Sequence, residues 1–374
     1  MNHLNVLDSF ENKAVGNEAI RKPYISIVIP AYNEEALIED SLTQICNYMK
    51  TLERKYYWEL ILVNDGSTDR TGEIADTFSK SRPNVFVLHH FVNFHIGQAL
   101  RFAFNNCKGD YIVTMDLDLS YSPEHIERLI ETILETRAKI VVASPYMKGG
   151  SVSNVPWMRS VLSKYANKFL SMTAASNIST LTGMVRAYDR KFIKSLNLKA
   201  MDYEINPEII YKAQLLRARI VEIPAELNWR FQKEIGKTRR SSMRVIRNII
   251  SCVFSGFIFR PFMFFVVPGT LLLMLSMVTL VWVLIHTWQA YLVLPKTTGA
   301  FDTFTSAALA AAFQKSPHTF VVGGVSLMVS IQLLSLGILA SQHKRYFEEL
   351  FHLGTSIYKA KNDKSNNVEH NNYK

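Results

Sequence analysis

The sequence predicts an α/β domain with a mostly parallel sheet, followed by two membrane-spanning helices. Between residues 23 and 240, short runs rich in β-branched residues alternate with segments of helical periodicity. That order is typical of parallel sheets whose two faces are both covered by helices. In the last third of the chain, two long apolar runs carry no charge, at residues 261–285 and 319–340. Each reaches the roughly 20 residues that an α-helix needs to cross the hydrocarbon of a membrane.

The elements of the α/β domain follow from these patterns in order. Apolar runs predict strands at residues 24–30, 58–65, 84–90 and 110–116. Helical spacing predicts helices at residues 33–50, 69–80 and 98–107. In such a sheet, ligands collect at the carboxyl ends of the strands. The polar stretches "PAYNEE", "NDGSTD" and "DLDLSYS" follow the first, second and fourth strand, so we expect a ligand site there.

Asp116 and Asp118 stand two residues apart behind the fourth strand. In an extended segment their side chains would point to the same side. Paired hard oxygens suit Mg²⁺ or Mn²⁺, with the remaining ligands supplied by substrate phosphates. A second interpretation is that the stretch leads into a helix, with Ser122 as N-cap and Pro123 at the first helical position. That interpretation leaves two acids beside apolar neighbours unexplained, because an unpaired buried charge is costly.

The other polar stretches have sufficient local explanations of their own. Asp65 closes the second strand, and Gly66 permits a tight turn after it. Asn33 can cap the first helix, whose opening acids the helix dipole favours.

Charge and hydropathy indicate a membrane partner rather than nucleic acid. The formal charge is +10 and the pI about 9.3. Because the chain also contains two long apolar runs, we interpret this positive charge as a preference for a membrane surface. Positively charged side chains cluster before the first run and after the second, and the connecting loop holds only Lys296 and Lys315. The positive-inside rule therefore predicts that both termini are cytoplasmic. The flanking basic residues are Arg239, Arg240, Arg244, Arg247 and Arg260 on one side and His343, Lys344 and Arg345 on the other.

Two further features agree with a cytoplasmic location of the α/β domain. The first twenty residues contain acids and no apolar core, so no secretory signal is expected. Cys46, Cys107 and Cys252 lie far apart without ligand-type spacing, as expected of reduced thiols.

The predicted organisation has seven parts. Residues 241–260 form a basic amphipathic helix, which we expect in the lipid interface, the alternative being a core-facing helix of the α/β domain. Residues 345–359 have the pattern of a weaker second interfacial helix, and a disordered polar tail is expected from Ala360. The parts are a flexible leader (1–22), the α/β domain (23–240), the interfacial helix (241–260), the first span (261–286), an extracytoplasmic loop (287–317), the second span (318–341) and a cytoplasmic tail (342–374).

The order of three motifs is more specific than any one of them. "IVIPAYNEE", then "VNDGSTD", then "GDYIVTMDLD" resembles the Rossmann-like GT-A domain of the inverting family 2 glycosyltransferases. Together with the spans, the chain is similar to polyprenyl-phosphate hexose synthases of the dolichyl-phosphate mannose synthase type. The similarity runs from about Tyr24 to Arg240. It implies transfer of a hexose, mannose favoured and glucose next, from a GDP- or UDP-sugar to dolichyl or undecaprenyl phosphate.

The resemblance also implies roles on the donor side of the site. Pro30, Tyr32, Glu34 and Asp65 should contact the base and ribose of the nucleotide. Mg²⁺ or Mn²⁺ should be held on the diphosphate by two carboxylates, those of Asp116 and Asp118.

On the acceptor side, Arg159, Ser163 and Arg230 fall where relatives bind the lipid phosphate. With Asp118, the two arginines are the implied catalytic residues. Arg186 and Glu208 would shape the sugar pocket, and Lys237 belongs to a basic loop that would close over the site.

Three departures from the family pattern concern the choice of donor. Pro145 stands where many relatives have an arginine before the tyrosine, which removes one expected phosphate contact. His95 and Ile96 replace a usual Gly and Lys, and Ser120 stands where some members use a glutamine near the metal. None of these removes the metal pair.

Rival functions remain at this stage. A membrane polysaccharide or glycolipid synthase with another acceptor should show more spans and a QxxRW-type motif, of which the domain has only Trp229-Arg230. A transporter is disfavoured by the missing P-loop and by spans without charges. A non-catalytic partner subunit is disfavoured by the intact acids. The expected partners are therefore a nucleotide sugar, a polyprenyl phosphate and a bilayer, without nucleic acid and with room for a homo-oligomer.

Overall fold

The computed structural model of this chain forms two compact units. It describes residues 22–155, the single positions 157, 161, 164 and 167, and residues 178–229, 262–294 and 301–371. The first unit contains the α/β domain, and the second contains the long apolar helices. The predicted leader, apart from Lys22, and the predicted interfacial helix at residues 241–260 lie outside the described residues.

Within the described part of the first unit, a seven-stranded sheet has the order β3-β2-β1-β4-β7-β5-β8. Adjacent strands are parallel except around β7, which is antiparallel to both β4 and β5. This confirms the predicted mostly parallel sheet. A small second sheet pairs β6 (Ser151–Ser153) with β9 (Glu226–Asn228). The strands of the main sheet are β1 (Tyr24–Ala31), β2 (Tyr57–Asn64), β3 (Val85–His89), β4 (Tyr111–Thr114), β5 (Ile140–Ser144), β7 (Arg186–Asp189) and β8 (Ile220–Pro224).

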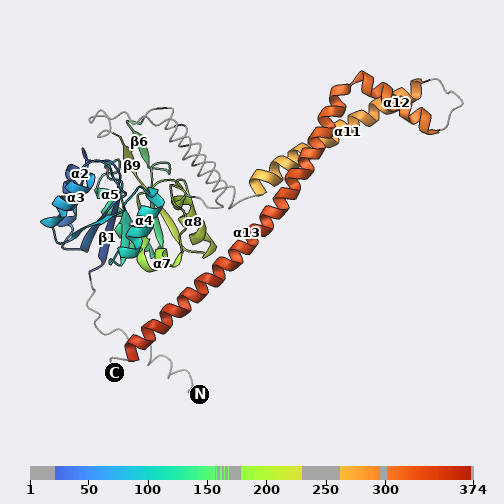
Figure 1. Cartoon of the computed structure of the whole chain (residues 1–374). Helices are drawn as coiled ribbons and strands as arrows, with labels where there is room; N and C mark the ends of the chain where they lie inside the picture. Colours follow the sequence, from blue (N-terminus) through green and yellow to red (C-terminus); the bar gives the residue numbers. More distant parts are fainter. Residues whose placement is uncertain are drawn as a thin grey trace, which may run out of the picture. The chain divides into compact units, whose positions relative to one another are not determined.

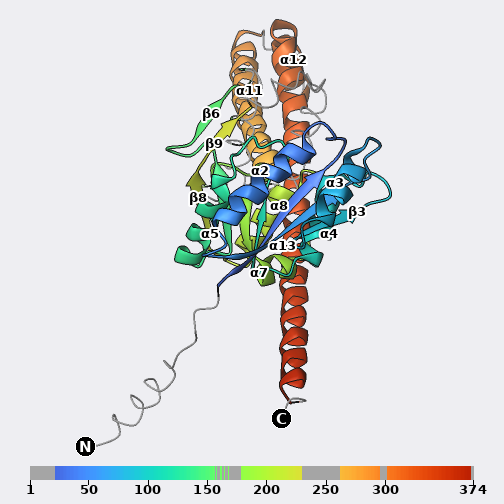
Figure 2. The ribbon, with the colours of Figure 1, turned by 90° about the vertical axis from the view of Figure 1, so that its left-hand side faces the viewer.

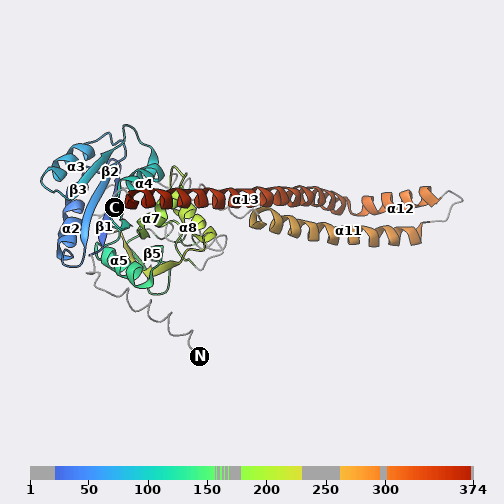
Figure 3. The same ribbon diagram turned by 90° about the horizontal axis from the view of Figure 1, so that it is seen from below.

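Helices cover both faces of the sheet, and Figure 3 shows the two layers from below. One layer holds α2 (Ile38–Thr51), α3 (Thr71–Lys80) and α5 (Glu124–Thr136), which Figure 2 shows from the front. The other holds α4 (His95–Asn106), α7 (Arg190–Ser195) and α8 (Ile205–Leu215). Strand alternation explains the division, because Ile25, Ile27 and Ile29 join the α2–α3–α5 core while buried Val28 points to the other layer.

Two predicted helix starts are wrong, for the same physical reason. Helix α2 begins at Ile38 rather than at residue 33, and Asn33, with φ 55°, lies in the preceding loop. Its Oδ1 accepts a hydrogen bond from the backbone N–H of Thr68 at 2.8 Å instead of capping the helix. Helix α5 begins at Glu124 with Pro123 as N-cap, and the Ser122 hydroxyl is hydrogen-bonded to His125 Nδ1 at 3.2 Å. In both cases the polar side chain expected to cap the helix is hydrogen-bonded to another group, Asn33 to the Thr68 N–H and Ser122 to the His125 ring.

The second unit is helical throughout its described residues. The π-helical turn η1 (Phe262–Val266) leads into α11 (Val267–Val293), which is followed by α12 (Phe301–Lys315) and α13 (Pro317–Asn371). Two segments, Phe262–Val293 and Pro317–Ile357, are long and apolar enough to cross a membrane, with mean hydropathies of 2.3 and 2.0. Helices α11 and α13 lie side by side (Figure 1), and Ser276 Oγ donates to the carbonyl of Gly323 at 3.2 Å.

Two expectations for this unit need correction or addition. The polar tail predicted to be disordered from Ala360 is instead helical as far as Asn371. Residues 345–359 likewise belong to α13 and form no separate helix. Extending an existing helix avoids the cost of nucleation, and no proline interrupts residues 318–371. The loop predicted at residues 287–317 contains the end of α11 and all of α12.

Candidate functional site

The predicted polar stretches meet at the carboxyl edge of the sheet. Strands β1, β2 and β4 are parallel neighbours, so the loops that follow Ala31, Asn64 and Thr114 leave from one edge. The first two loops are joined directly, because the N–H of Asn33 donates to Ser67 Oγ at 3.0 Å. The N–H of Glu34 donates to Thr71 Oγ1 at 2.8 Å. These bonds hold two of the predicted nucleotide-binding stretches against each other.

Asp116 and Asp118 lie in a turn beyond β4, both half-buried. The predicted extended geometry is wrong, because residues 117 and 118 form the turn and Leu119 has a φ of 49°. Asp118 Oδ1 accepts a hydrogen bond from the Ser120 N–H at 3.0 Å and a second from the Ser120 hydroxyl. Ser120, whose role the sequence left open, therefore orients the Asp118 carboxylate.

Tyr121 is a neighbour of this pair that the sequence did not single out. Its side chain is almost fully buried, and its ring meets that of His125 edge to face. Burial, and then the nearby charge of Asp116, raises the pKa of the Tyr121 phenol. The hydroxyl therefore stays protonated beside the acidic turn. No local sequence pattern marks this role, because it depends on burial.

Asp65 is buried at the end of β2 and is bound to the loop that follows β3. His90 Nδ1 donates to Asp65 Oδ1 at 2.7 Å, and the N–H of Phe94 donates to the same oxygen at 3.0 Å. The ring of His90 stacks on Phe102, with the ring centroids 5.0 Å apart. Sequence reasoning missed His90, although its position just after a strand end is the signal that identified Asp65.

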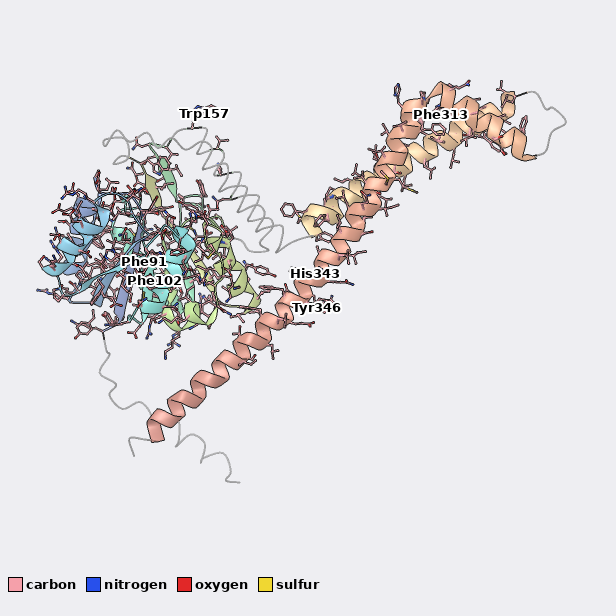
Figure 4. The ribbon with its side chains drawn as sticks, in the orientation of Figure 1. Phe91, Phe102, Trp157, Phe313, His343 and Tyr346 are labelled. Atoms are coloured by element: carbon pink, nitrogen blue, oxygen red, sulfur yellow. The ribbon has the colours of Figure 1, made fainter. Side chains whose placement is uncertain are left out.

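Gly66 follows Asp65 in a conformation that needs glycine. Its φ is 67°, and an added Cβ would lie 2.2 Å from the carbonyl carbon of Val92. The loop after β3 therefore packs directly on this turn, which brings His90 within reach of Asp65. Figure 4 labels Phe91, in this loop, and Phe102, on α4.

Arg186 lies at the start of β7 and is fully buried. Its guanidinium donates to the carbonyl of Leu181 at 2.6 Å and to that of Asn206 at 3.0 Å. Burial lowers the pKa of this guanidinium. Arg186 thus joins the segment before β7 to the first turn of α8. If it shapes the sugar pocket as predicted, it would do so by positioning these two segments.

Glu208 is also committed to internal partners. Its Oε2 accepts hydrogen bonds from the N–H groups of Lys199 at 3.1 Å and Ala200 at 2.9 Å. Lys212 Nζ lies 2.6 Å from Glu208 Oε1, and both side chains are buried. The same ammonium donates to the carbonyl of Asn197 at 2.8 Å. This pair anchors the loop that precedes α8.

That loop in turn contacts the start of α4. The N–H of Gln98 donates to the carbonyl of Met201 at 3.1 Å, and Gly97 packs against the backbone of the same residue. His95 Nδ1 is 4.0 Å from Asp202 Oδ2. Glu208 is therefore linked to the edge of the site through the loop at residues 197–203 and the first turn of α4.

Of the departures from the family pattern, His95 is the most informative. Its φ of 68° lies in the left-handed region, where glycine is favoured. Glycine, the residue that the resemblance implies at this position, adopts this conformation without a steric penalty. Ile96 is half-buried and Pro145 is buried.

The remaining predicted site residues differ in how far the structure describes them. Tyr32 is 41% exposed directly after β1, and Pro30 is half-buried within that strand. Four predicted residues lie outside the described part of the chain: Arg159, Ser163, Arg230 and Lys237.

The donor set fits a divalent ion that the substrate helps to bind. Among the described residues, no group of three or more His, Cys, Asp or Glu side chains is placed to hold a metal by itself. Asp116 and Asp118 supply hard carboxylate oxygens at the ligand edge. Mg²⁺ is commonly held by one or two carboxylates together with substrate phosphates. The residues present are therefore those expected for such an ion.

A mostly parallel sheet with these loops at its carboxyl edge defines a GT-A-like α/β domain. Residues 26–196 match the family described as glycosyl transferase family 2. This part of the chain is therefore similar to family 2 glycosyltransferases, as the order of the three motifs predicted.

Curated relatives include enzymes that act on polyprenyl phosphates. A dolichyl-phosphate beta-glucosyltransferase from Trichomonas vaginalis is 28% identical, over 57% of this chain and 71% of its own length. A polyprenol monophosphomannose synthase from Mycolicibacterium smegmatis is 29% identical, over 59% of this chain and 82% of the relative. A dolichol-phosphate mannosyltransferase from Pyrococcus furiosus is 29% identical, over 60% of this chain and 62% of the relative. The resemblance to polyprenyl-phosphate hexose synthases is thereby confirmed.

Solved structures to which this chain shows similarity include a glucosyl-3-phosphoglycerate synthase from M. tuberculosis. It is 20% identical with a TM-score of 0.46, over 63% of this chain and 80% of that chain. A mannosyltransferase from Pyrobaculum calidifontis, solved with GDP-Man and Mn²⁺, is 15% identical with a TM-score of 0.44, over 90% of this chain and 87% of that chain.

Proposed function

We propose that this chain transfers a hexose, mannose favoured and glucose next, from a GDP- or UDP-sugar to a polyprenyl phosphate at the cytoplasmic face of a membrane. One observation carries the proposal: Asp65 follows β2, and Asp116 and Asp118 follow β4, the two parallel strands that flank β1 in a domain similar to family 2 glycosyltransferases. Two helices apolar enough to span a membrane support a lipid acceptor. The activities for which the relatives are named, dolichyl-phosphate glucosylation and polyprenol monophosphomannose synthesis, agree with it.

On the donor side, Asp65 would contact the base and ribose, held in place by His90 and the N–H of Phe94. Pro30, Tyr32 and Glu34 would line the same subsite. Asp116 and Asp118 would hold Mg²⁺ or Mn²⁺, which when bound neutralises charge on the departing nucleoside diphosphate. Ser120 would keep the Asp118 carboxylate oriented toward that position.

On the acceptor side, the chemistry needs little from a general base. A phosphate monoester has its second pKa near about 6, so the lipid phosphate is already an anionic nucleophile at neutral pH. Its single attack on the anomeric carbon would invert the configuration there. Arg159 and Arg230, with Ser163, would bind the acceptor phosphate, because guanidinium groups suit bidentate contact with phosphate.

The topology belongs to the same proposal. Both termini and the α/β domain would be cytoplasmic, with the segment between α11 and α13 on the opposite side. The basic residues that flank the two spans support this orientation.

The test is a transfer assay on the purified full-length protein. Labelled GDP-mannose, UDP-glucose and UDP-N-acetylglucosamine are each given with a polyprenyl phosphate, with and without chelator. We expect a glycolipid of inverted anomeric configuration from one donor, lost on chelation and reduced at least about 100-fold by Asp118→Asn. Asp40→Asn, which removes an exposed acid in the first turn of α2, is the matched control and should retain activity. Full activity of Asp118→Asn, or no glycolipid from any donor, would refute the proposal.

A further inference from the structure

Helix α13 carries an apolar seam that runs from the end of the predicted second span, residues 318–341, into the part of the helix beyond it. The seam residues recur at alternating intervals of three and four, the heptad pattern of a coiled coil. Those with large apolar side chains are solvent-exposed, from 48% at Leu336 to 68% at Leu350. The seam consists of Leu336, Leu339, His343, Tyr346, Leu350, Leu353 and Ile357.

The length of α13 places much of this seam outside a bilayer. At ~1.5 Å per residue, residues 317–342 span about 39 Å, enough for the roughly 30 Å of hydrocarbon. Residues 343–371 then extend about 43 Å further. Tyr346, Leu350, Leu353 and Ile357 are 58–68% exposed in this extension. A row of such side chains in water needs a cover.

The partner helix within the unit ends before the extension begins. Ser276 meets Gly323, Gly269 packs against Leu334, and Phe265 and Val266 pack against Gly337. The two helices are therefore antiparallel, and η1 begins at Phe262, at about the level where the extension starts. Among the described residues of this unit, no other helix continues alongside α13 there. Figure 4 marks the start of the extension with His343 and Tyr346.

A lipid surface fits the seam less well than a second helix does. A continuous helix cannot both cross a bilayer and lie flat in its surface, and α13 runs without a break from Pro317 to Asn371. The charged side chains near the seam lie off it, and Lys344 pairs with Glu348 at 3.5 Å on another face. That separation of an apolar seam from flanking charges is typical of coiled-coil helices.

We propose that the α13 extension pairs with the same segment of a second copy of this chain, forming a parallel two-stranded coiled coil from about His343 to Ile357. Spans in one membrane give the two extensions the same orientation and a high effective concentration, so a short seam suffices. In a parallel pair, identical seam positions face each other, so the seam is complementary to itself. The inference does not depend on the proposed enzymatic activity.

Cysteine cross-linking in native membranes tests the register of this pair. Leu350→Cys and Leu353→Cys are compared with His352→Cys and Ser356→Cys, all in the full-length chain with Cys252→Ser. Cys46 and Cys107 are buried and remain. Under mild oxidation we expect the two seam positions to give at least about fivefold more covalent dimer than the two controls. Equal cross-linking at all four positions, or none, would overturn the proposal.

A second measurement tests the pair without a cross-link. Leu350→Glu with Leu353→Glu should shift the full-length protein in nanodiscs or detergent from dimer toward monomer, measured by single-molecule photobleaching or mass photometry. His352→Glu with Ser356→Glu adds the same charge off the seam and should leave the dimer intact. A dimer unaffected by the seam variant would overturn the proposal. So would protection of Leu350→Cys from a water-soluble maleimide without cross-linking, since the cover would then be lipid or another part of the chain.

Discussion

Substituting Glu208 separates its structural role from a direct role in the sugar pocket. Glu208→Gln would leave Lys212, which is 4% exposed, without its carboxylate at 2.6 Å. Removing one partner of a buried ion pair costs about 3–5 kcal/mol, because the remaining charge stays buried. For a domain of this size, we expect the midpoint of thermal unfolding to fall by about 6–20 °C. The glutamine oxygen can still accept from the N–H groups of Lys199 and Ala200, so most of the loss should come from the ammonium.

The double variant Glu208→Gln/Lys212→Met provides the control. With no buried charge left, it should regain most of the lost stability, to within about 1–2 kcal/mol of the unmodified protein. Thermal unfolding in detergent measures stability, and glycolipid formation measures activity. If Glu208 acts by holding the loop at residues 197–203, activity returns together with stability. Restored stability without activity would indicate direct contact with the substrate, and a stable Glu208→Gln would refute the reasoning altogether.

Three further predictions concern the fold around the site. Burial lowers the pKa of His125, so the unfolded state binds the proton more readily than the folded state. The free energy of unfolding should therefore be complete above a pH of about 6.5 and fall below it. His125→Gln should flatten this pH dependence, measured by denaturant unfolding at several pH values. Glu59, which is 1% exposed, accepts hydrogen bonds from Ser26 Oγ at 2.5 Å and from the Lys108 N–H at 2.7 Å. Because Glu59→Leu leaves both donors without an acceptor, it should lose at least about 2 kcal/mol of unfolding free energy. Glu59→Gln keeps an acceptor oxygen and should lose less. Gly66→Ala should cost more than the roughly 1–2 kcal/mol of left-handed strain, because its Cβ would meet the Val92 backbone at 2.2 Å. Gly149→Ala, with φ 89° and no contact closer than 3.4 Å, is its control, and equal losses for the two glycines would contradict the clash.

The sheet could be predicted from the sequence because its evidence is local. Runs such as Tyr24–Ala31 and Tyr57–Asn64 are almost wholly buried, and a buried strand needs a continuous apolar sequence. The same evidence predicts that the polar loops gather at one edge, because the carboxyl ends of parallel strands lie there. Asp65 and Asp116 are in loops that leave from this edge.

What the sequence could not supply are pairings between distant segments. The Asp65–His90 contact joins residues 25 apart, and Asn33 reaches Thr68 across 35 positions. Such bonds outweigh local sequence preferences, which is why Asn33 lies in a loop and does not cap α2. The extent of α13 was missed for a different reason, because composition alone does not show that a polar tail continues a helix already begun.

The acidic turn joins these two kinds of information. Asp116 is placed by the end of β4, so the sheet determines its position, whereas Asp118 lies in a turn whose next residue, Leu119, has a φ of 49°. The sheet by itself does not aim the second carboxylate. Ser120 does so, because its N–H and its hydroxyl both donate to Asp118 Oδ1. The N–H of Asn228, the last residue of β9, donates at 2.8 Å to the Ser120 carbonyl, which anchors the turn to a strand far along the chain. The spacing of the two aspartates predicts a metal pair, while the orientation of the Asp118 carboxylate depends on Ser120 and on β9, which the spacing does not show.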